Sequence, residues 1–145
     1  MTKRRLPNNY MFALQILSPE GQIFSDSVDE VQLPTPNGEI SVLTHHVPIF
    51  SKLSEGTITV KRGGKNTIIA ILGGFLKVKE NVVMVLSDYA IRAESIQSAR
   101  ALEAKKLAEE IIINKQSTAE LIMAEKNLQK SLLELKVADK VKHHS

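Results

Sequence analysis

The chain has 145 residues, of which 43% are hydrophobic, 24% charged and 4% aromatic, and it contains no cysteine. The lack of cysteine excludes a disulfide framework, thiolate metal sites and a cysteine nucleophile. A formal net charge of +3, from 19 Lys and Arg against 16 Asp and Glu, is too small a surplus to indicate nucleic-acid binding.

The first residues lack the pattern of a targeting segment. Three basic residues are followed by Pro7 and two asparagines instead of a continuous apolar core, so a cytosolic start is predicted. The longest apolar runs, such as Ile68–Leu72 and Val82–Leu86, fall far short of the ~18 to 20 residues that cross a bilayer. No membrane-spanning helix is therefore expected.

Residues that break helices are confined to the front of the chain. All five prolines lie at or before Pro48, all seven glycines at or before Gly74, and every aromatic residue at or before Tyr89. Glycine and proline supply the backbone angles of turns and aromatic residues favour strands, so their joint absence afterwards predicts helix. We expect a strand domain over residues 1–90 and a helical domain over residues 91–145.

The first domain is expected to contain short antiparallel strands, which together indicate a β-sandwich or barrel. Arg62–Lys65 and Lys79–Asn81 join neighbouring strands as two hairpins. The apolar run Ile68–Leu72 predicts a strand covered on both faces, and Gly73–Gly74 predicts a tight passage between strands. The predicted strands are Tyr10–Leu17, Val28–Leu33, Thr57–Val60, Thr67–Leu72, Phe75–Val78 and Val82–Leu86.

The second domain is predicted to be two helices of ~20 residues each, packed antiparallel as a hairpin. Ser117 and Glu120 form an S-x-x-E capping box, which marks the start of the second helix. His143 and His144 are expected to form a disordered tail. Apolar residues recur at three- and four-residue spacing on both helices. The predicted stripes are Ile96, Ala101, Ala104, Leu107, Ala108, Ile111 and Ile112 on the first helix and Leu121, Ala124, Leu128, Leu132 and Leu135 on the second.

These two stripes are narrow, and the first is rich in alanine. Burying a leucine stabilises by ~1.5 to 3 kcal/mol, whereas ordering each residue costs ~1 to 2 kcal/mol, so a lone two-helix hairpin is expected to be marginal. A hairpin held this weakly can swing open, which makes it a candidate moving part.

No residue pattern indicates a catalytic or metal site. Arg62–Thr67 superficially resembles a phosphate loop, but that motif would require glycine in place of Thr59 and a helix after the loop. His45 and His46 are adjacent, and neighbours on an extended chain point to opposite faces, so they cannot chelate one metal together. Loop histidines are the plainer interpretation. We expect no metal, no catalytic residue and no enzymatic activity of the chain by itself.

Three segments resemble the epsilon subunit of the F-type ATP synthase. They are LPTPNGEISVLTHHVPIFSKLSEGTITV (Leu33–Val60), LGGFLKVKENVVMVLSDYAIR (Leu72–Arg92) and SARALEAKKLAEE (Ser98–Glu110). The resemblance runs from Phe12 to Val137 in the order sandwich, linker, hairpin. It implies a non-catalytic central-stalk subunit that binds the gamma subunit and the c ring and helps to couple proton flow to ATP synthesis.

The resemblance also implies a location and a regulatory part. The chain would lie at the cytoplasmic face of a bacterial cell membrane, with the chloroplast thylakoid as the second option, and would associate with the membrane only through the complex. Its hairpin would rise toward the alpha and beta subunits and restrain ATP hydrolysis. Lys126, Lys130, Lys136 and Lys140 would then approach an acidic segment of beta, although a solvated helix face explains these lysines more simply.

Two residues are implied to touch the c ring. In this family a Gly-Glu pair and a downstream histidine contact the polar loops of the ring, and these positions correspond to Glu39 and His46. A turn carboxylate and a solvent-facing loop histidine are the alternatives. The chain has Thr44 and His45 where the family usually has proline and glycine, so a different loop shape is expected.

Some bacterial relatives bind ATP on the hairpin through an I-[DL]-x-x-R-A stretch, which corresponds here to Ile96, Arg100 and Ala101. Gln97 replaces the acidic residue, and Glu134 stands where an arginine would face the phosphates. A carboxylate repels a triphosphate, so strong ATP binding is not expected, and no other cofactor is implied. Arg100 is more simply a helix-surface or inter-helix salt-bridge residue.

Two other classes of function stay open. A sandwich that carries a helical hairpin also suits a protein-interaction module unrelated to ATP synthase, and co-purification with gamma and the c ring would distinguish the two. Nucleic-acid binding rests only on a sequence pI near 9.2. The basic residues are spread over both halves and aromatic residues are too few to stack on bases, so no nucleic-acid partner is expected.

Overall fold

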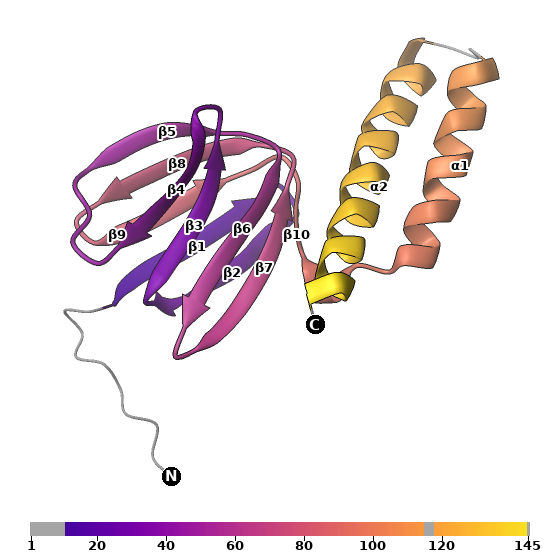
Figure 1. The fold of residues 1–145 in the computed structure, drawn as a ribbon. Coiled ribbons are helices and arrows are strands. Elements are labelled where there is room, and N and C mark those ends of the chain that lie inside the picture. The colour runs from indigo at the N-terminus through magenta and orange to yellow at the C-terminus, as the bar shows by residue number, and fades with distance from the viewer. Residues whose placement is uncertain (1–10, 115–117, 145) are drawn as a thin grey trace. The chain divides into compact units, whose positions relative to one another are not determined.

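The computed structural model describes residues 11–114 and 118–144. Within these residues the chain forms ten strands, followed by a short 3-10 helix and two α-helices (Figure 1). The strands are β1 (Phe12–Ser18), β2 (Gly21–Val28), β3 (Glu30–Thr35), β4 (Gly38–Leu43), β5 (Ile49–Leu53), β6 (Gly56–Arg62), β7 (Lys65–Ile71), β8 (Gly74–Lys79), β9 (Val82–Leu86) and β10 (Ala90–Arg92). The helices are η2 (Ala93–Ser95), α1 (Ser98–Asn114) and α2 (Thr118–His144).

The strands form two five-stranded sheets that make up a β-sandwich, which confirms the predicted fold class. Sheet A has the order β2-β1-β9-β8-β5, and sheet B has the order β10-β7-β6-β3-β4. Every pair is antiparallel except one: β1 runs parallel to β9, from Ala13 opposite Val82 to Leu17 opposite Leu86. The first strand is therefore inserted between two later ones, which ties the start of the sandwich to its end.

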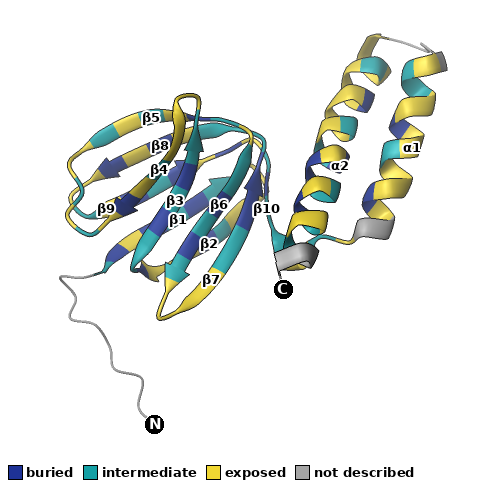
Figure 2. Cartoon of the chain, in the orientation of Figure 1, coloured by how far each residue is buried: buried dark blue, intermediate teal, exposed yellow. Residues whose placement is uncertain are grey.

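The core lies between the two sheets, because each strand points alternate side chains inward. Figure 2 shows this alternation as bands of buried and exposed residues along the strands. In β7 three consecutive residues from Ile69 to Ile71 are buried, as predicted for a strand covered on both faces. The largest fully buried side chains are Leu14, Ile16, Val28, Val31, Leu33, Val42, Leu53, Ile58, Val60, Ile69, Ile71 and Leu76.

Four strands were not predicted. They are β2, β4, β5 and β10, and the predicted strand Val28–Leu33 is in fact the last residue of β2 followed by β3, with a break at Asp29. The reason is local: β2 and β4 contain glycine, serine and acidic residues, which have weak strand propensity by themselves. Pairing with β1 and β3 determines their conformation instead. Tyr10, the predicted start of the first strand, lies outside the described residues.

The two predicted hairpins are present as two-residue turns. Arg62 pairs with Lys65 across Gly63 and Gly64, whose φ angles are 55° and 81°. Lys79 pairs with Val82 across Glu80 and Asn81, whose φ angles are 52° and 62°. Two successive positive φ angles match the right-handed twist of the flanking strands, which is why such turns favour glycine and asparagine.

The chain divides into two units, Met1–Arg92 and Ala93–Ser145. In the second unit α1 and α2 pack as a hairpin, and α1 has 17 residues, close to the expected ~20, whereas α2 has 27 and is longer than expected. α2 continues through His144, so the predicted disordered tail at His143 and His144 is incorrect. Ser117, half of the predicted capping box, lies outside the described residues.

The buried seam of the hairpin differs from the predicted stripes. The seam residues are small and seven apart: Ala101 and Ala108 on α1, Ala124 and Ser131 on α2. Leu133 and Val137 of α2 are buried as well. A seven-residue repeat is the period at which two helices stay in contact, and small residues on it allow close approach. The four small seam residues bury little apolar area themselves, and Leu133 and Val137 are the larger buried side chains of α2.

Three of the residues assigned to the stripes are exposed. Leu107 is 55% exposed and Leu132 is 45% exposed, and Ala104 is also on the surface. Ser131, a polar residue, takes the buried position that was assigned to Leu132. A stripe inferred from hydrophobicity alone passes over a buried serine, because a small hydroxyl residue can occupy a tight helix contact.

Candidate functional site

The turn after β4 carries His46 and is held by side-chain hydrogen bonds. The backbone N–H of His46 donates to the carbonyl oxygen of Leu43 at 3.2 Å, which closes the turn. The N–H of His45 donates to Oδ1 of Asn81 at 2.8 Å. His45 has a φ of 58°, in the left-handed region that glycine favours. Position 45 thus has a left-handed conformation although its residue is histidine.

Glu39 and His46 lie toward opposite ends of one strand. Glu39 is the second residue of β4, and His46 comes three residues after its last residue, Leu43. Glu39 and Leu43 alone are separated by roughly 13 Å of extended chain. The structure therefore does not bring the two predicted contact residues together at one point. β4 is the edge strand of sheet B, however, and the exposed side chains of Glu39, Ser41 and Leu43 form a strip that leads toward the turn.

The predicted nucleotide residues are only partly brought together. A shallow groove of about 280 Å³ on the hairpin is lined by Ser95, Gln97, Arg100, Ala101, Ala104 and Glu134. Arg100 and Ala101 share this groove, whereas Ile96 is not among its lining residues. The lining holds one cationic and one anionic side chain, so their charges offset each other. This composition does not favour a triphosphate, which needs several cationic groups or backbone amides.

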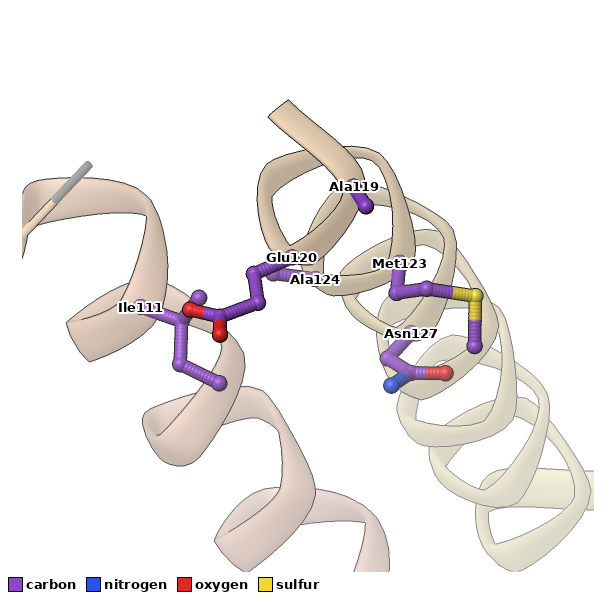
Figure 3. Close-up of a pocket in the computed structure, with 6 residues that line it drawn as sticks. All are labelled: Ile111, Ala119, Glu120, Met123, Ala124 and Asn127. Carbon is purple, nitrogen blue, oxygen red and sulfur yellow. The ribbon is translucent and has the colours of Figure 1, made fainter. Parts of the chain in front are cut away.

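A second groove lies between the helices of the hairpin, toward the connection that joins them. It has a volume of about 260 Å³ and is lined by Ile111, Ala119, Glu120, Met123, Ala124 and Asn127 (Figure 3). Its surface is almost entirely apolar, and Figure 3 shows Glu120 extending toward Ile111 of the facing helix. Its lining includes no cationic side chain that could bind an anion such as a nucleotide phosphate. We therefore interpret the groove as incomplete packing between α1 and α2.

The surface with the strongest physical signature was missed by the sequence analysis. The outward side of sheet A carries a group of apolar side chains on three adjacent strands, here called the apolar face: Phe50, Phe75, Val82, Met84 and Leu86. Phe50 is 72% exposed and Phe75 is 50% exposed, and their rings stack with centroids 6.0 Å apart. Phe75 lies directly opposite Leu86 across β8 and β9.

Three exposed lysines are interleaved with the apolar face. Lys52 lies opposite Phe75, Lys77 lies between Phe50 and Met84, and Lys79 lies opposite Val82. A partner surface that is apolar with carboxylates among its apolar residues would complement this pattern.

The outward side of sheet B is different in character. Its central strands β3 and β6 present polar side chains: Glu30, Gln32, Thr57, Thr59 and Lys61. The two central strands of sheet B thus face outward with polar residues, whereas β5, β8 and β9 of sheet A face outward with aromatic and aliphatic ones. A contiguous apolar patch of this kind on a folded domain marks a surface that binds another protein.

Two further findings concern metal binding and membrane-spanning helices. In residues 11–114 and 118–144 no three histidine or acidic side chains lie together as a metal site would require. Across the same described ranges, no helix combines the length and apolarity needed to cross a membrane.

The family-model comparison matches the sandwich. A model described as ATP synthase, Delta/Epsilon chain, beta-sandwich domain covers residues 11–93. The chain is 39% identical over 132 residues to the ATP synthase epsilon chain of Dehalococcoides mccartyi, which covers 90% of this chain and 94% of the relative. It is 38% identical over 126 residues to the epsilon chain of Desulforamulus reducens, with 87% and 96% covered.

Two solved structures share the fold. A chain in the OSCP, F1 and c-ring structure of the Euglena gracilis mitochondrial ATP synthase aligns with a TM-score of 0.62 at 22% identity, over 99% of this chain and 85% of the other. A chain in the central stalk and c-ring structure of the Tetrahymena thermophila mitochondrial ATP synthase aligns with a TM-score of 0.53 at 10% identity, over 87% and 95%.

A β-sandwich that exposes a group of aromatic and aliphatic side chains on one of its sheets is typical of a protein that binds other proteins. The chain belongs to the family of ATP synthase epsilon chains. It is therefore a non-catalytic subunit of the ATP synthase complex.

Proposed function

We propose that the chain works in the central stalk of a proton-translocating F-type ATP synthase, where it binds the gamma subunit and the c ring and helps to couple proton flow to ATP synthesis. The observation that carries this proposal is the apolar face on sheet A of a member of the epsilon family. A stalk subunit must be fixed to its neighbours firmly enough to turn with them, and such an attachment needs a buried apolar contact.

Gamma is the proposed occupant of the apolar face. Five apolar side chains on three hydrogen-bonded strands form a rigid surface, so little conformational entropy is lost when a partner covers it. Phe50 and Phe75 are aromatic and stacked, which suits them to act as the residues that contribute most to binding. The sandwich unit would serve as a stiff adaptor between gamma and the ring.

The edge strip of β4 is the proposed contact with the c ring. Glu39 at its start and His46 in the turn after its end are the two polar residues that the family resemblance assigns to this contact. Because they lie far apart along the strand, the contact is an extended line along the sheet edge. Charged and polar contacts of this kind mainly guide orientation and add little affinity each.

The hairpin is the proposed regulatory part. Its seam of Ala101, Ala108, Ala124 and Ser131 buries little apolar area, and a groove of about 260 Å³ interrupts the packing between the helices. Separating two helices that meet through such small side chains would cost little free energy. In the extended state it would reach the alpha and beta subunits and restrain ATP hydrolysis.

The location follows from the complex. The relatives at 38% and 39% identity are bacterial, so the proposed place is the cytoplasmic face of the bacterial cell membrane, as a peripheral subunit. The complex, and not this chain, would provide the attachment to the membrane.

Deleting residues 94–145 from the chain in a reconstituted complex tests both parts of the proposal. We expect the truncated chain still to co-purify with gamma and the c ring, because the apolar face is intact. We expect ATP hydrolysis to rise about three- to tenfold, which corresponds to ~0.6 to 1.4 kcal/mol of lost restraint. Unchanged hydrolysis would remove the regulatory role, and failure of the full-length chain to co-purify with gamma would favour an interaction module unrelated to ATP synthase.

The hairpin groove supports a separate prediction about ATP. Glu134 and Arg100 line it together, so replacing the carboxylate by a cation changes the local charge by two. We expect Glu134→Arg to raise the affinity for ATP about fivefold, since a favourable exposed charge contact is worth at most ~1 kcal/mol. Calorimetric titration of the full chain with ATP measures it. Glu125→Arg, on an exposed part of α2 away from the groove, is the matched control and should leave the affinity unchanged.

A further inference from the structure

Asn81 sits at the junction of three segments that are far apart in the sequence. It belongs to the turn between β8 and β9, both of which contribute to the apolar face. Its backbone carbonyl oxygen accepts from the N–H of Ala13 at 3.2 Å, at the start of β1. Its side chain is half-buried and reaches the turn after β4, where His46 lies.

The side chain of Asn81 makes a set of hydrogen bonds that only one amide orientation satisfies. Oδ1 accepts from the N–H of His45 at 2.8 Å, and Nδ2 donates to the carbonyl oxygen of Met11 at 3.0 Å. The hydroxyl of Thr44 lies 3.3 Å from both Oδ1 of Asn81 and the carbonyl oxygen of Met11. With the amide reversed, Nδ2 would face a backbone N–H and Oδ1 a carbonyl oxygen, so both bonds would be lost.

Both ends of this contact are in unusual backbone conformations. Asn81 has a φ of 62° and His45 a φ of 58°, and left-handed conformations are uncommon for residues other than glycine. Asparagine tolerates this region better than most residues, but histidine at position 45 needs its surroundings to hold it there. The bond from its N–H to Asn81 supplies that support.

We infer that Asn81 is a positioning residue, which holds the turn after β4 so that His46 is presented to the c ring. The inference rests on the proposed contact between His46 and the ring. It adds a physical link between the apolar face and that contact, because the turn that contains Asn81 joins two strands of the apolar face. Docking of the apolar face and placement of His46 thus depend on one rigid hairpin.

The test compares two substitutions in the same turn. Asn81→Gly keeps the left-handed conformation, which glycine adopts readily, and removes only the side-chain bonds. Glu80→Gly is the matched control, since Glu80 is exposed and has a similar φ of 52°. In the full chain, hydrogen exchange of the His45 amide should be about three- to tenfold faster in Asn81→Gly and unchanged in Glu80→Gly. Asn81→Asp keeps an acceptor for the His45 N–H but loses the donor to the Met11 carbonyl oxygen, so its protection should lie between that of the unmodified chain and that of Asn81→Gly.

A second readout separates positioning from the proposed contact itself. With gamma bound, the affinity of each variant for the isolated c ring is measured beside that of His46→Ala. We expect His46→Ala and Asn81→Gly to weaken ring binding to a similar extent, about three- to tenfold, and Glu80→Gly to bind as the unmodified chain does. If His46→Ala weakens binding and Asn81→Gly does not, the positioning role is wrong and the contact stands. If His46→Ala has no effect on ring binding, the proposed contact between His46 and the ring is wrong. If the His45 amide exchanges at the same rate in Asn81→Gly as in the unmodified chain, Asn81 does not hold the turn after β4.

Discussion

Replacing Phe50 and Phe75 together by threonine is expected to weaken binding of the chain to the gamma subunit at least about a hundredfold. Buried aromatic residues at the centre of an interface typically contribute ~2 kcal/mol or more each, and tenfold in affinity corresponds to ~1.4 kcal/mol. The two rings stack with centroids 6.0 Å apart, so a partner would cover them as one surface. Titration calorimetry with purified gamma measures the change.

The double substitution should leave the sandwich folded. Both phenylalanines point outward from their strands, and threonine is a good strand former, so little core packing is lost. Thr57→Ala with Thr59→Ala, on the polar outward side of sheet B, is the control and should bind gamma normally. Equal affinities of the two double variants for gamma would show that the apolar face is not the attachment surface.

The apolar face illustrates what sequence patterns leave undetermined in a strand. The segment from Phe75 to Val78 alternates, which predicts a strand with Leu76 and Val78 facing the core, but the pattern does not show which residues of other strands lie beside Phe75. The structure buries Leu76 and Val78 and exposes Phe75 and Lys77. The register of β8 against β5 and β9 determines which side chains lie beside Phe75, and that pairing is a property of the whole sheet.

The predictions that were confirmed depend on local chemistry. The two-residue hairpin at Gly63 and Gly64 follows from the backbone angles that only certain residues adopt, and the helical second unit follows from the loss of turn-forming residues after Tyr89. The predictions that were wrong depend on packing. Ser131 replaces Leu132 in the helix seam because close approach of two helices selects for small size as well as for hydrophobicity.

The candidate site was predicted less completely than the fold. Glu39 and His46 were assigned by family resemblance, and only the structure shows that Glu39 lies near the start of β4 and His46 in the turn after its end. Asn81 carried no functional signal in the sequence, because a hydrogen bond between residues 36 positions apart has no local pattern. Contacts of this kind are set by tertiary structure, whereas turns and helix limits are set by nearby residues.

The largest effect on stability is expected for Gly74→Ala, at the start of β8. Gly74 has a φ of 152°, and a Cβ at this position would clash with the carbonyl oxygen of Leu86 and lie 3.0 Å from the Cα of Ser87. Because both neighbours are backbone atoms of β9 and the segment after it, the strands would have to separate. Strain and lost strand pairing together are expected to lower the free energy of unfolding by ~3 to 5 kcal/mol, a large part of the ~5 to 15 kcal/mol typical of a domain.

Gly21→Ala separates the clash from the backbone strain. Gly21 has a φ of 129°, also unfavourable for alanine, but a Cβ added there would meet no atom within 4 Å, so we expect a loss of only ~1 to 2 kcal/mol. Both tyrosines of the chain belong to the unit Met1–Arg92, so urea denaturation followed by tyrosine fluorescence reports on that unit alone. The difference between the two variants measures how closely β8 approaches the backbone at Leu86. Equal losses would mean that this approach is looser than the structure shows, and that the glycine at position 74 is required for its backbone angle alone.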